Sequence, residues 1–182
     1  PTSSAATIHA FCLGVLQCGD LETKLRTPRG PEGSVLPDTP SGPSVLIDRP
    51  CRGPGLSMGS GAAPLPSPSS LADPAQRRRC LSRFAHHELQ AVEYFAWALL
   101  AWPDAPPPLR RALLAALSDE QRHCRLYLDR LHALDGRFDT DDHSDYFWRH
   151  AQATARSESG IAAFLAGMGL TLEQANLDFT LT

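Results

Sequence analysis

The chain has 182 residues and a formal net charge of −3, which is enough length for one domain with a hydrophobic core. A net negative charge differs from the positive excess that is typical of nucleic-acid-binding domains. No apolar run approaches the ~20 residues that span a bilayer. We therefore expect neither nucleic acid nor a membrane as a partner. The five cysteines lack zinc-finger spacing, and we interpret them as reduced thiols of a cytoplasmic protein.

Residues 1–72 differ in composition from the rest of the chain. They hold 11 of the 16 prolines and 9 of the 13 glycines. A short helix is predicted over residues 7–25, weakened by Gly14 and Gly19. Its apolar side consists of Ile8, Phe11, Val15 and Leu16. Residues 26–70 show no sustained period, so we expect extended chain along the helical body or disorder, most of all over residues 53–70.

A helical domain is predicted from residue 73 to residue 182, and its first long helix begins at Asp73. Asp73 can cap this helix, and Pro74 suits the first helical position. Apolar residues then recur at helical spacing, at Leu81, Phe84, Val92, Phe95 and Leu99. Glu88 lies on this apolar stripe, whereas Glu93, about 140° further round the helix, belongs to another face.

A second long helix is predicted over residues 109–134. Its apolar stripe consists of Leu109, Leu113, Ala116, Tyr127, Leu131 and Leu134. Glu120 and His123 both fall on that stripe. The proline-rich turn over residues 103–108 ends one helix and begins the next, which makes the two helices antiparallel neighbours. The carboxylates of Glu88 and Glu120 are therefore expected at similar heights on facing surfaces.

Two carboxylates and an imidazole on buried helix faces indicate a bound cation. A buried unpaired carboxylate is costly and would become protonated instead of staying charged. Glu88 together with the Glu-x-x-His of Glu120 and His123 is half of the ligand set of di-iron and di-manganese four-helix bundles. Carboxylate and imidazole suit iron or manganese. The alternative is a salt-bridged surface, because Glu-x-x-His is common by chance.

The chain beyond residue 134 predicts shorter helices. Four aspartates, at positions 139, 141, 142 and 145, lack the EF-hand pattern and indicate an acidic loop. A helix with aromatic anchors is expected over residues 143–155, and another over residues 161–168. Thr171 begins a new helical segment in which Glu173 lies between Leu170 and Leu177 at helical spacing. Glu173 is either a further ligand or an ordinary acidic residue of a first helical turn.

Four segments, AHHELQAVEYFAWAL, DEQRHCRLYLDRL, HSDYFW and MGLTLEQANLDF, resemble a bacterial family of unknown function, DUF455. The resemblance covers roughly residues 75–182. It implies an all-α, ferritin-like helical bundle. It also implies that Glu88, Glu120, His123 and Glu173 are metal ligands, with a di-iron cofactor expected and manganese as an alternative. It implies no substrate and no catalytic residue.

The family pattern also requires a fourth core helix with a second Glu-x-x-His, and this sequence has only the one at Glu120 and His123. Asn176 stands where that spacing from Glu173 would place a histidine, and asparagine is a weak ligand for such a metal. We therefore expect an incomplete bundle, truncated relative to the family. A homodimer or a complementing helical chain would supply what is missing.

Three residues are candidates for supporting the ligands, namely Asp119, His87 and Asn176. Asp119 can orient a histidine of a neighbouring helix through its second ring nitrogen. His86 and His87 beside Glu88 suggest a hydrolytic zinc site, but successive helix residues do not share one face.

Three functions are compatible with these residues. The first is an enzyme, a di-iron oxidase or oxygenase of unknown substrate, in which Glu120 bridges two metals. The second is iron binding or storage without turnover. The third is a helical interaction protein whose metal site is incomplete and catalytically silent. The missing ligands favour the third for this chain, whereas the motifs favour the first for the family.

Overall fold

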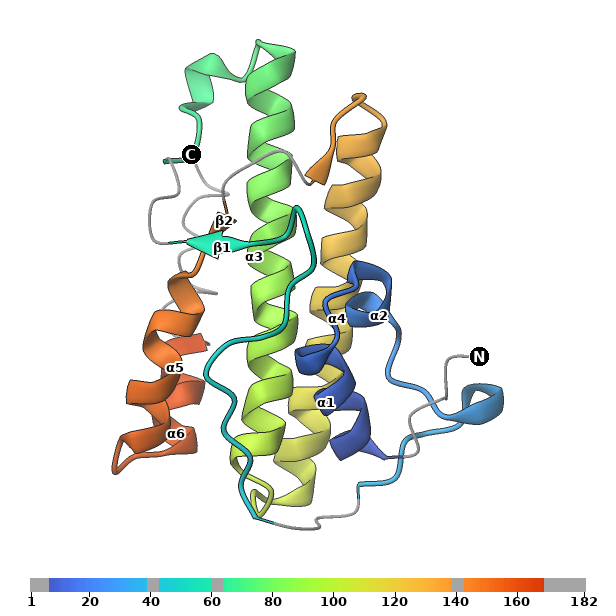
Figure 1. Ribbon diagram of the computed structural model, residues 1–182, viewed down its shortest axis with the longest axis vertical. Coiled ribbons are helices and arrows are strands. Elements are labelled where there is room, and N and C mark those ends of the chain that lie inside the picture. The colour runs from blue at the N-terminus through green and yellow to red at the C-terminus, as the bar shows by residue number, and fades with distance from the viewer. Residues whose placement is uncertain (1–6, 39–42, 60–63, 139–142, 169–182) are drawn as a thin grey trace.

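The computed structural model describes residues 7–38, 43–59, 64–138 and 143–168, and this part of the chain is mostly helical (Figure 1). The helices are α1 (Ile8–Gln17), α2 (Leu21–Leu25), α3 (Pro74–Ala101), α4 (Pro107–His132), α5 (Tyr146–Arg156) and α6 (Ile161–Leu165). Two 3-10 turns, η1 (Pro31–Gly33) and η2 (Pro68–Ser70), lie between α2 and α3, and strands β1 (Met58–Gly59) and β2 (His143–Ser144) form one parallel pair. The expectation of a predominantly helical chain is confirmed for the described residues.

The helices α3 and α4 form the long antiparallel pair that the sequence predicts (Figure 1). The Asp73 carboxylate accepts a hydrogen bond from the backbone N–H of Ala75 at 2.8 Å, so the predicted cap is present. The proline-rich connection ends α3 and begins α4 at Pro107. Both helices lie within a few residues of their predicted ranges because caps and prolines act locally.

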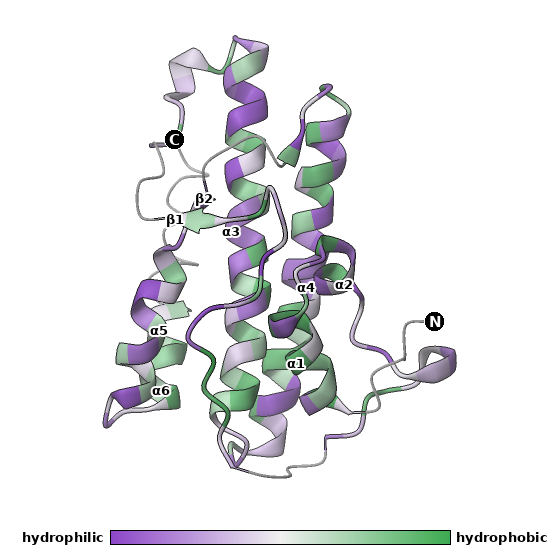
Figure 2. Ribbon diagram, in the orientation of Figure 1, coloured by the Kyte–Doolittle hydropathy of each residue, from purple (hydrophilic) through white to green (hydrophobic). Residues whose placement is uncertain are grey.

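The burial of α3 is broader than a single stripe. Residues 89–101 are buried without exception, since α1, α4, α5 and the extended chain surround this half of the helix. Hydrophilic residues concentrate towards the other end of α3 (Figure 2). Phe84, which we placed on the buried stripe, is 38% exposed, and its ring contacts that of Tyr127 at 5.3 Å between centroids.

The buried face of α4 is also rotated from the predicted stripe. Its buried apolar residues are Leu113, Leu117, Cys124, Leu128 and Leu131. The cause is contact with α2, because the buried Gln121 side-chain amide donates to the carbonyls of Lys24 and Arg26 at 2.8 and 2.7 Å. Tyr127 is consequently only half-buried, and Glu120 lies at the edge of the packed face.

The helix expected over residues 7–25 is two helices, α1 and α2. The four predicted apolar residues of α1 are all buried. The break falls at Gly19, where the backbone of residue 53 passes very close. A Cβ on Gly19 would lie only 2.8 Å from the backbone nitrogen of Gly53, and the Gly53 N–H donates to the Gly19 carbonyl at 2.9 Å.

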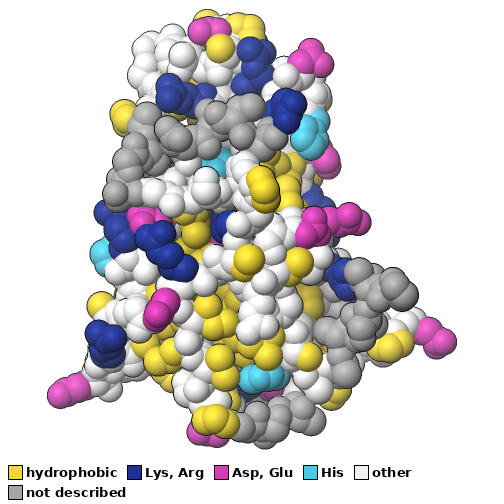
Figure 3. Space-filling view, in the orientation of Figure 1, with side chains coloured by type: hydrophobic (Ala, Val, Ile, Leu, Met, Phe, Trp, Pro, Cys, Tyr) yellow, Lys and Arg dark blue, Asp and Glu magenta, His cyan; other side chains and the backbone are white. Residues whose placement is uncertain are grey.

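Residues 43–59, here called the strap, run along α3 as extended chain (Figure 1). The Val45 N–H donates to the Leu100 carbonyl at 3.0 Å, and the Cys51 N–H donates to the Leu16 carbonyl at 2.7 Å. Hydrophobic side chains gather on the middle and lower part of this face (Figure 3). Residues 53–59 and 64–70, where we expected disorder, contain β1 and η2, while residues 60–63 lie outside the described part.

The strap also sets the start of α5. Met58 and Gly59 pair with His143 and Ser144, so the helix begins at Tyr146 instead of residue 143. Both hydrophobic clusters of the structure combine residues before and after position 72, so the Pro/Gly-rich segment and the helices share their core. Within the described ranges no helix has the length and apolar character to cross a membrane, and all five cysteines are free.

A buried ion cluster joins α2, the strap and α3. Lys24 Nζ lies 2.9 Å from Glu93 Oε1, and Arg52 places its Nε and Nη2 at 2.8 Å from the two carboxylate oxygens of Glu93. All three side chains are almost fully buried. Burial lowers the pKa of Lys24, and the Glu93 charge opposes that shift. Glu93 therefore faces the strap and α2, on another face than Glu88.

We expect Glu93→Gln to destabilise the protein by about 3–5 kcal/mol, because the variant leaves two buried cations without their shared carboxylate. Urea unfolding followed by circular dichroism measures this loss. Glu22→Gln, an exposed change on α2, is the matched control and should stay within about 0.5 kcal/mol of wild type. Equal unfolding midpoints for wild type and Glu93→Gln would contradict the structural role of the cluster.

Candidate metal centre

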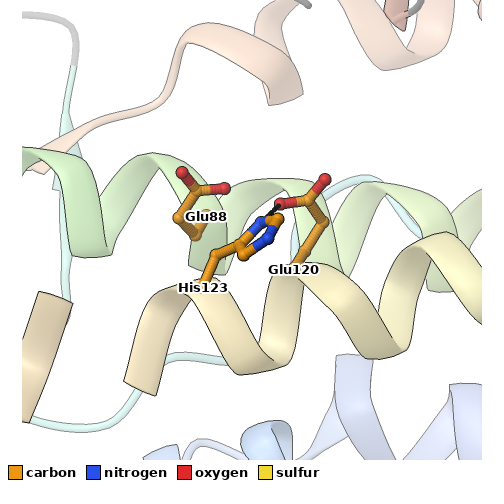
Figure 4. A group of neighbouring side chains, drawn as sticks. All are labelled: Glu88, Glu120 and His123. Carbon is orange, nitrogen blue, oxygen red and sulfur yellow. Dashed lines mark hydrogen bonds and ion pairs between the residues drawn. The ribbon is translucent and has the colours of Figure 1, made fainter. Parts of the chain in front are cut away.

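Glu88 from α3 meets Glu120 and His123 from α4 (Figure 4). One ligand atom from each residue can be chosen so that all three atoms lie within 4.8 Å of one another. Glu120 and His123 share a helix face because they are three residues apart. Glu88 comes opposite them because α3 and α4 pack antiparallel through a short turn. The structure thus brings together three of the four predicted ligands.

The three side chains differ in burial and in their contacts. Glu120 is only 8% exposed, whereas the His123 side chain is 41% exposed and Glu88 is half-buried. His123 Nδ1 lies 3.1 Å from Glu120 Oε2. Two carboxylates and one imidazole form a donor set that suits iron or manganese. The partial exposure gives the group access to solvent on one side.

His87 lies beside the group, on the side of α5. Its ring packs against Phe147 at 5.1 Å between centroids. Burial lowers the pKa of His87, and the negative charge of Glu120 opposes the shift. His87 is thus close enough to Glu120 for the two side chains to interact electrostatically.

Two residues near the group were not identified from the sequence as part of it. Burial raises the pKa of Tyr127, and the negative charge of Glu88 raises it further. Burial also raises the pKa of Cys124, whose thiol donates to the Ala85 carbonyl at 3.2 Å. A protonated thiol is a poor metal ligand, so Cys124 does not extend the donor set. The signal for Tyr127 was its position four residues after His123, on the same helix face.

His86 points away from this group. Its Nε2–H donates to the Ser144 carbonyl at 2.7 Å, and its ring stacks on His143 at 4.3 Å between centroids. Burial, together with the charge of Arg52, lowers the pKa of His86 to about 2. The two successive histidines therefore face different neighbours, which argues against a shared zinc site.

Asp119 is a correction to the sequence-based prediction. Its side chain is 62% exposed and pairs with Arg122 at 3.3 Å, so it orients no histidine among the described residues. One residue step turns a helix by about 100°, which carries Asp119 from the face of Glu120 to solvent.

Glu173 and Asn176 lie outside the described residues. Asp145, from the expected acidic loop, is buried and pairs with Arg49 and Arg149.

A cleft of about 590 Å³ lies away from this group. It is formed by α2, the strap and the end of α4, and its lining includes Leu21, Leu56, Phe138 and His132. None of the three clustered residues lines it, so this cleft and the acidic cluster are separate features.

We expect the double variant Glu88→Leu and Glu120→Leu to melt a few degrees above the metal-free wild type. Bringing two carboxylates together in a partly desolvated place is unfavourable, and functional sites commonly reduce stability in this way. About 1 kcal/mol corresponds to roughly 2–4 °C for a chain of this size. Differential scanning calorimetry in the presence of a chelator measures the Tm of each protein. Asp119→Asn is the control, because it removes an exposed carboxylate of the same helix outside the cluster. A clearly less stable double variant would identify the carboxylates as structural ion-pair partners.

The model of a family described as "Protein of unknown function (DUF455)" matches residues 29–182. The match begins before the strap and includes both long helices. No curated protein and no solved structure matches the chain.

Proposed function

Because the chain belongs to the DUF455 family, whose description names no reaction, we propose from the geometry that this protein binds iron or manganese through Glu88, Glu120 and His123. The observation that carries the proposal is the convergence of their ligand atoms within 4.8 Å. Carboxylate oxygens and imidazole nitrogens are the donors that these metals accept, and the described residues nearby offer no thiolate.

The helix arrangement supports a ferritin-like, carboxylate-bridged di-metal centre. One Glu on a helix and a Glu-x-x-His on its antiparallel neighbour form half of such a ligand set. Glu120 would bridge two metals, while Glu88 and His123 would be terminal ligands. We propose Glu173 as a further carboxylate. A bound di-iron pair would supply dioxygen-dependent oxidation of a substrate, whereas the protein side chains hold and orient the metals and limit the access of water.

The neighbours of the ligands have a definable part in this proposal. His87 is held by Phe147 close to Glu120, where it can stabilise the carboxylate through its ring N–H. Tyr127 contributes a protonated phenol beside Glu88 and Glu120, because burial and both charges keep its pKa high. These two residues limit the polarity of the site without adding negative charge.

Metal titration tests the proposal directly. We expect anaerobic calorimetry with ferrous iron, and separately with manganese, to show binding that Glu120→Gln and His123→Ala each weaken by at least about 10-fold, because loss of an outer-shell partner alone costs about 10–100-fold. Asp119→Asn and His132→Ala are the controls, because both remove exposed groups of α4 outside the cluster. Unchanged binding in Glu120→Gln and His123→Ala would refute the site. Binding absent from wild type would favour a helical interaction protein with a silent site.

The ligand count leads us to propose a partner. A di-metal site of this kind uses four Glu and two His, whereas the candidates here are three Glu and one His. A second copy of the chain, or a complementing helical chain, would restore the second imidazole.

We therefore expect ferrous iron to shift wild type towards a dimer in sedimentation velocity, under nitrogen, while Glu120→Gln remains monomeric. Iron analysis of each sedimenting species gives the stoichiometry. A stable monomer that retains two irons would contradict the need for a partner and would require ligands beyond those named.

A further inference from the structure

Arg83, on the N-terminal half of α3, has a buried guanidinium edge without acceptors. Its Nε and Nη2 atoms are inaccessible to solvent, and neither has a hydrogen-bond partner. No salt bridge involves Arg83 among the residues that the structure describes. Most buried guanidinium groups are paired, because an unpaired buried charge is strongly unfavourable.

The two unpartnered atoms lie on the same edge of the guanidinium. This edge offers two parallel N–H groups at the spacing of the two oxygens of a carboxylate or a phosphate. Arg52 shows the same edge in use within this protein, since its Nε and Nη2 each lie 2.8 Å from a Glu93 oxygen. Arg83 thus presents the same donors without an acceptor in the described part of the chain.

In the described part of the chain, the groups that follow Arg83 on this side of α3 carry little negative charge to neutralise it. Glu93 is already shared by two cations, Lys24 and Arg52, so that cluster has one positive charge in excess. His86, one helical turn after Arg83, donates its Nε2–H to a carbonyl and has Arg52 at 3.5 Å from its other ring nitrogen. These neighbours favour an added anion over a further cation.

We propose that Arg83 is the binding residue of an oxyanion site, whose ligand is a small anion with a carboxylate or phosphate group held by the Nε–Nη2 edge. The site is distinct from the metal centre. Arg83 precedes Glu88 by five residues, which places the two about 140° apart around the helix. The inference therefore does not depend on metal binding.

The test compares Arg83→Met and Arg83→Lys with Arg79→Met, an exposed arginine one turn earlier on α3. The probes are sodium phosphate and sodium succinate, each against sodium chloride at equal ionic strength, in metal-free buffer. We expect an anion at ten times its Kd to raise the Tm of wild type and Arg79→Met by about 3–6 °C. Arg83→Lys keeps the positive charge but loses the two parallel N–H donors of the guanidinium, so both Arg83 variants should lose this rise in Tm.

The outcomes separate the possible occupants. A larger rise with phosphate, or with succinate, assigns the anion class and supports the proposal. An equal rise in Arg83→Met would place anion binding elsewhere and overturn it. No rise in wild type beyond that in chloride, with Arg83→Met less stable than wild type, would show that the chain or water occupies this edge and would also overturn it. If Arg83→Met does not fold, phosphate calorimetry on Arg83→Lys decides, with at least tenfold weaker binding expected.

Discussion

The buried carboxylate of Glu93 is the interaction on which the arrangement of the chain around α3 depends. It holds Lys24 of α2 and Arg52 of the strap against the same point of the helix. A buried carboxylate tolerates desolvation only with partners, and these two cations reach it only when α2 and the strap are both in place. One charge on α3 therefore makes the position of two otherwise weakly structured segments specific. Gly19 adds to this by letting the backbone at Gly53 approach closely.

The acidic group at Glu88, Glu120 and His123 has the opposite character. Two of its three members are carboxylates, the histidine is partly exposed, and the ligand atoms lie within 4.8 Å of one another. Charges placed together in this way are unfavourable for the metal-free fold and favourable for a bound cation. Glu93, by contrast, is paired with two buried cations, which identifies it as a structural carboxylate on the same helix as the candidate ligand Glu88.

The long helix α3 thus presents different chemistry on different sides. One side contributes Glu88 to the acidic group shared with α4. Another side carries Arg83, whose donor edge has no acceptor among the described residues. His86 lies on that side as well, and its ring donates a hydrogen bond to the Ser144 carbonyl of β2. Towards its C-terminal end the helix is buried all round, which makes it a rigid support for both sides. Rigid support matters because metal and anion sites need donors held in place before the ligand arrives.

The sequence by itself determined the two long helices, their antiparallel turn and the meeting of Glu88, Glu120 and His123, because caps, prolines and spacings of three or four residues act within one or two helical turns. It also indicated the family. Only the tertiary structure decided which faces are buried, that Asp119 is exposed and Phe84 half-covered, that a helix breaks at Gly19, and that the strap runs along α3. Those outcomes depend on contacts between residues far apart in the chain, and local periodicity carries no information about such partners.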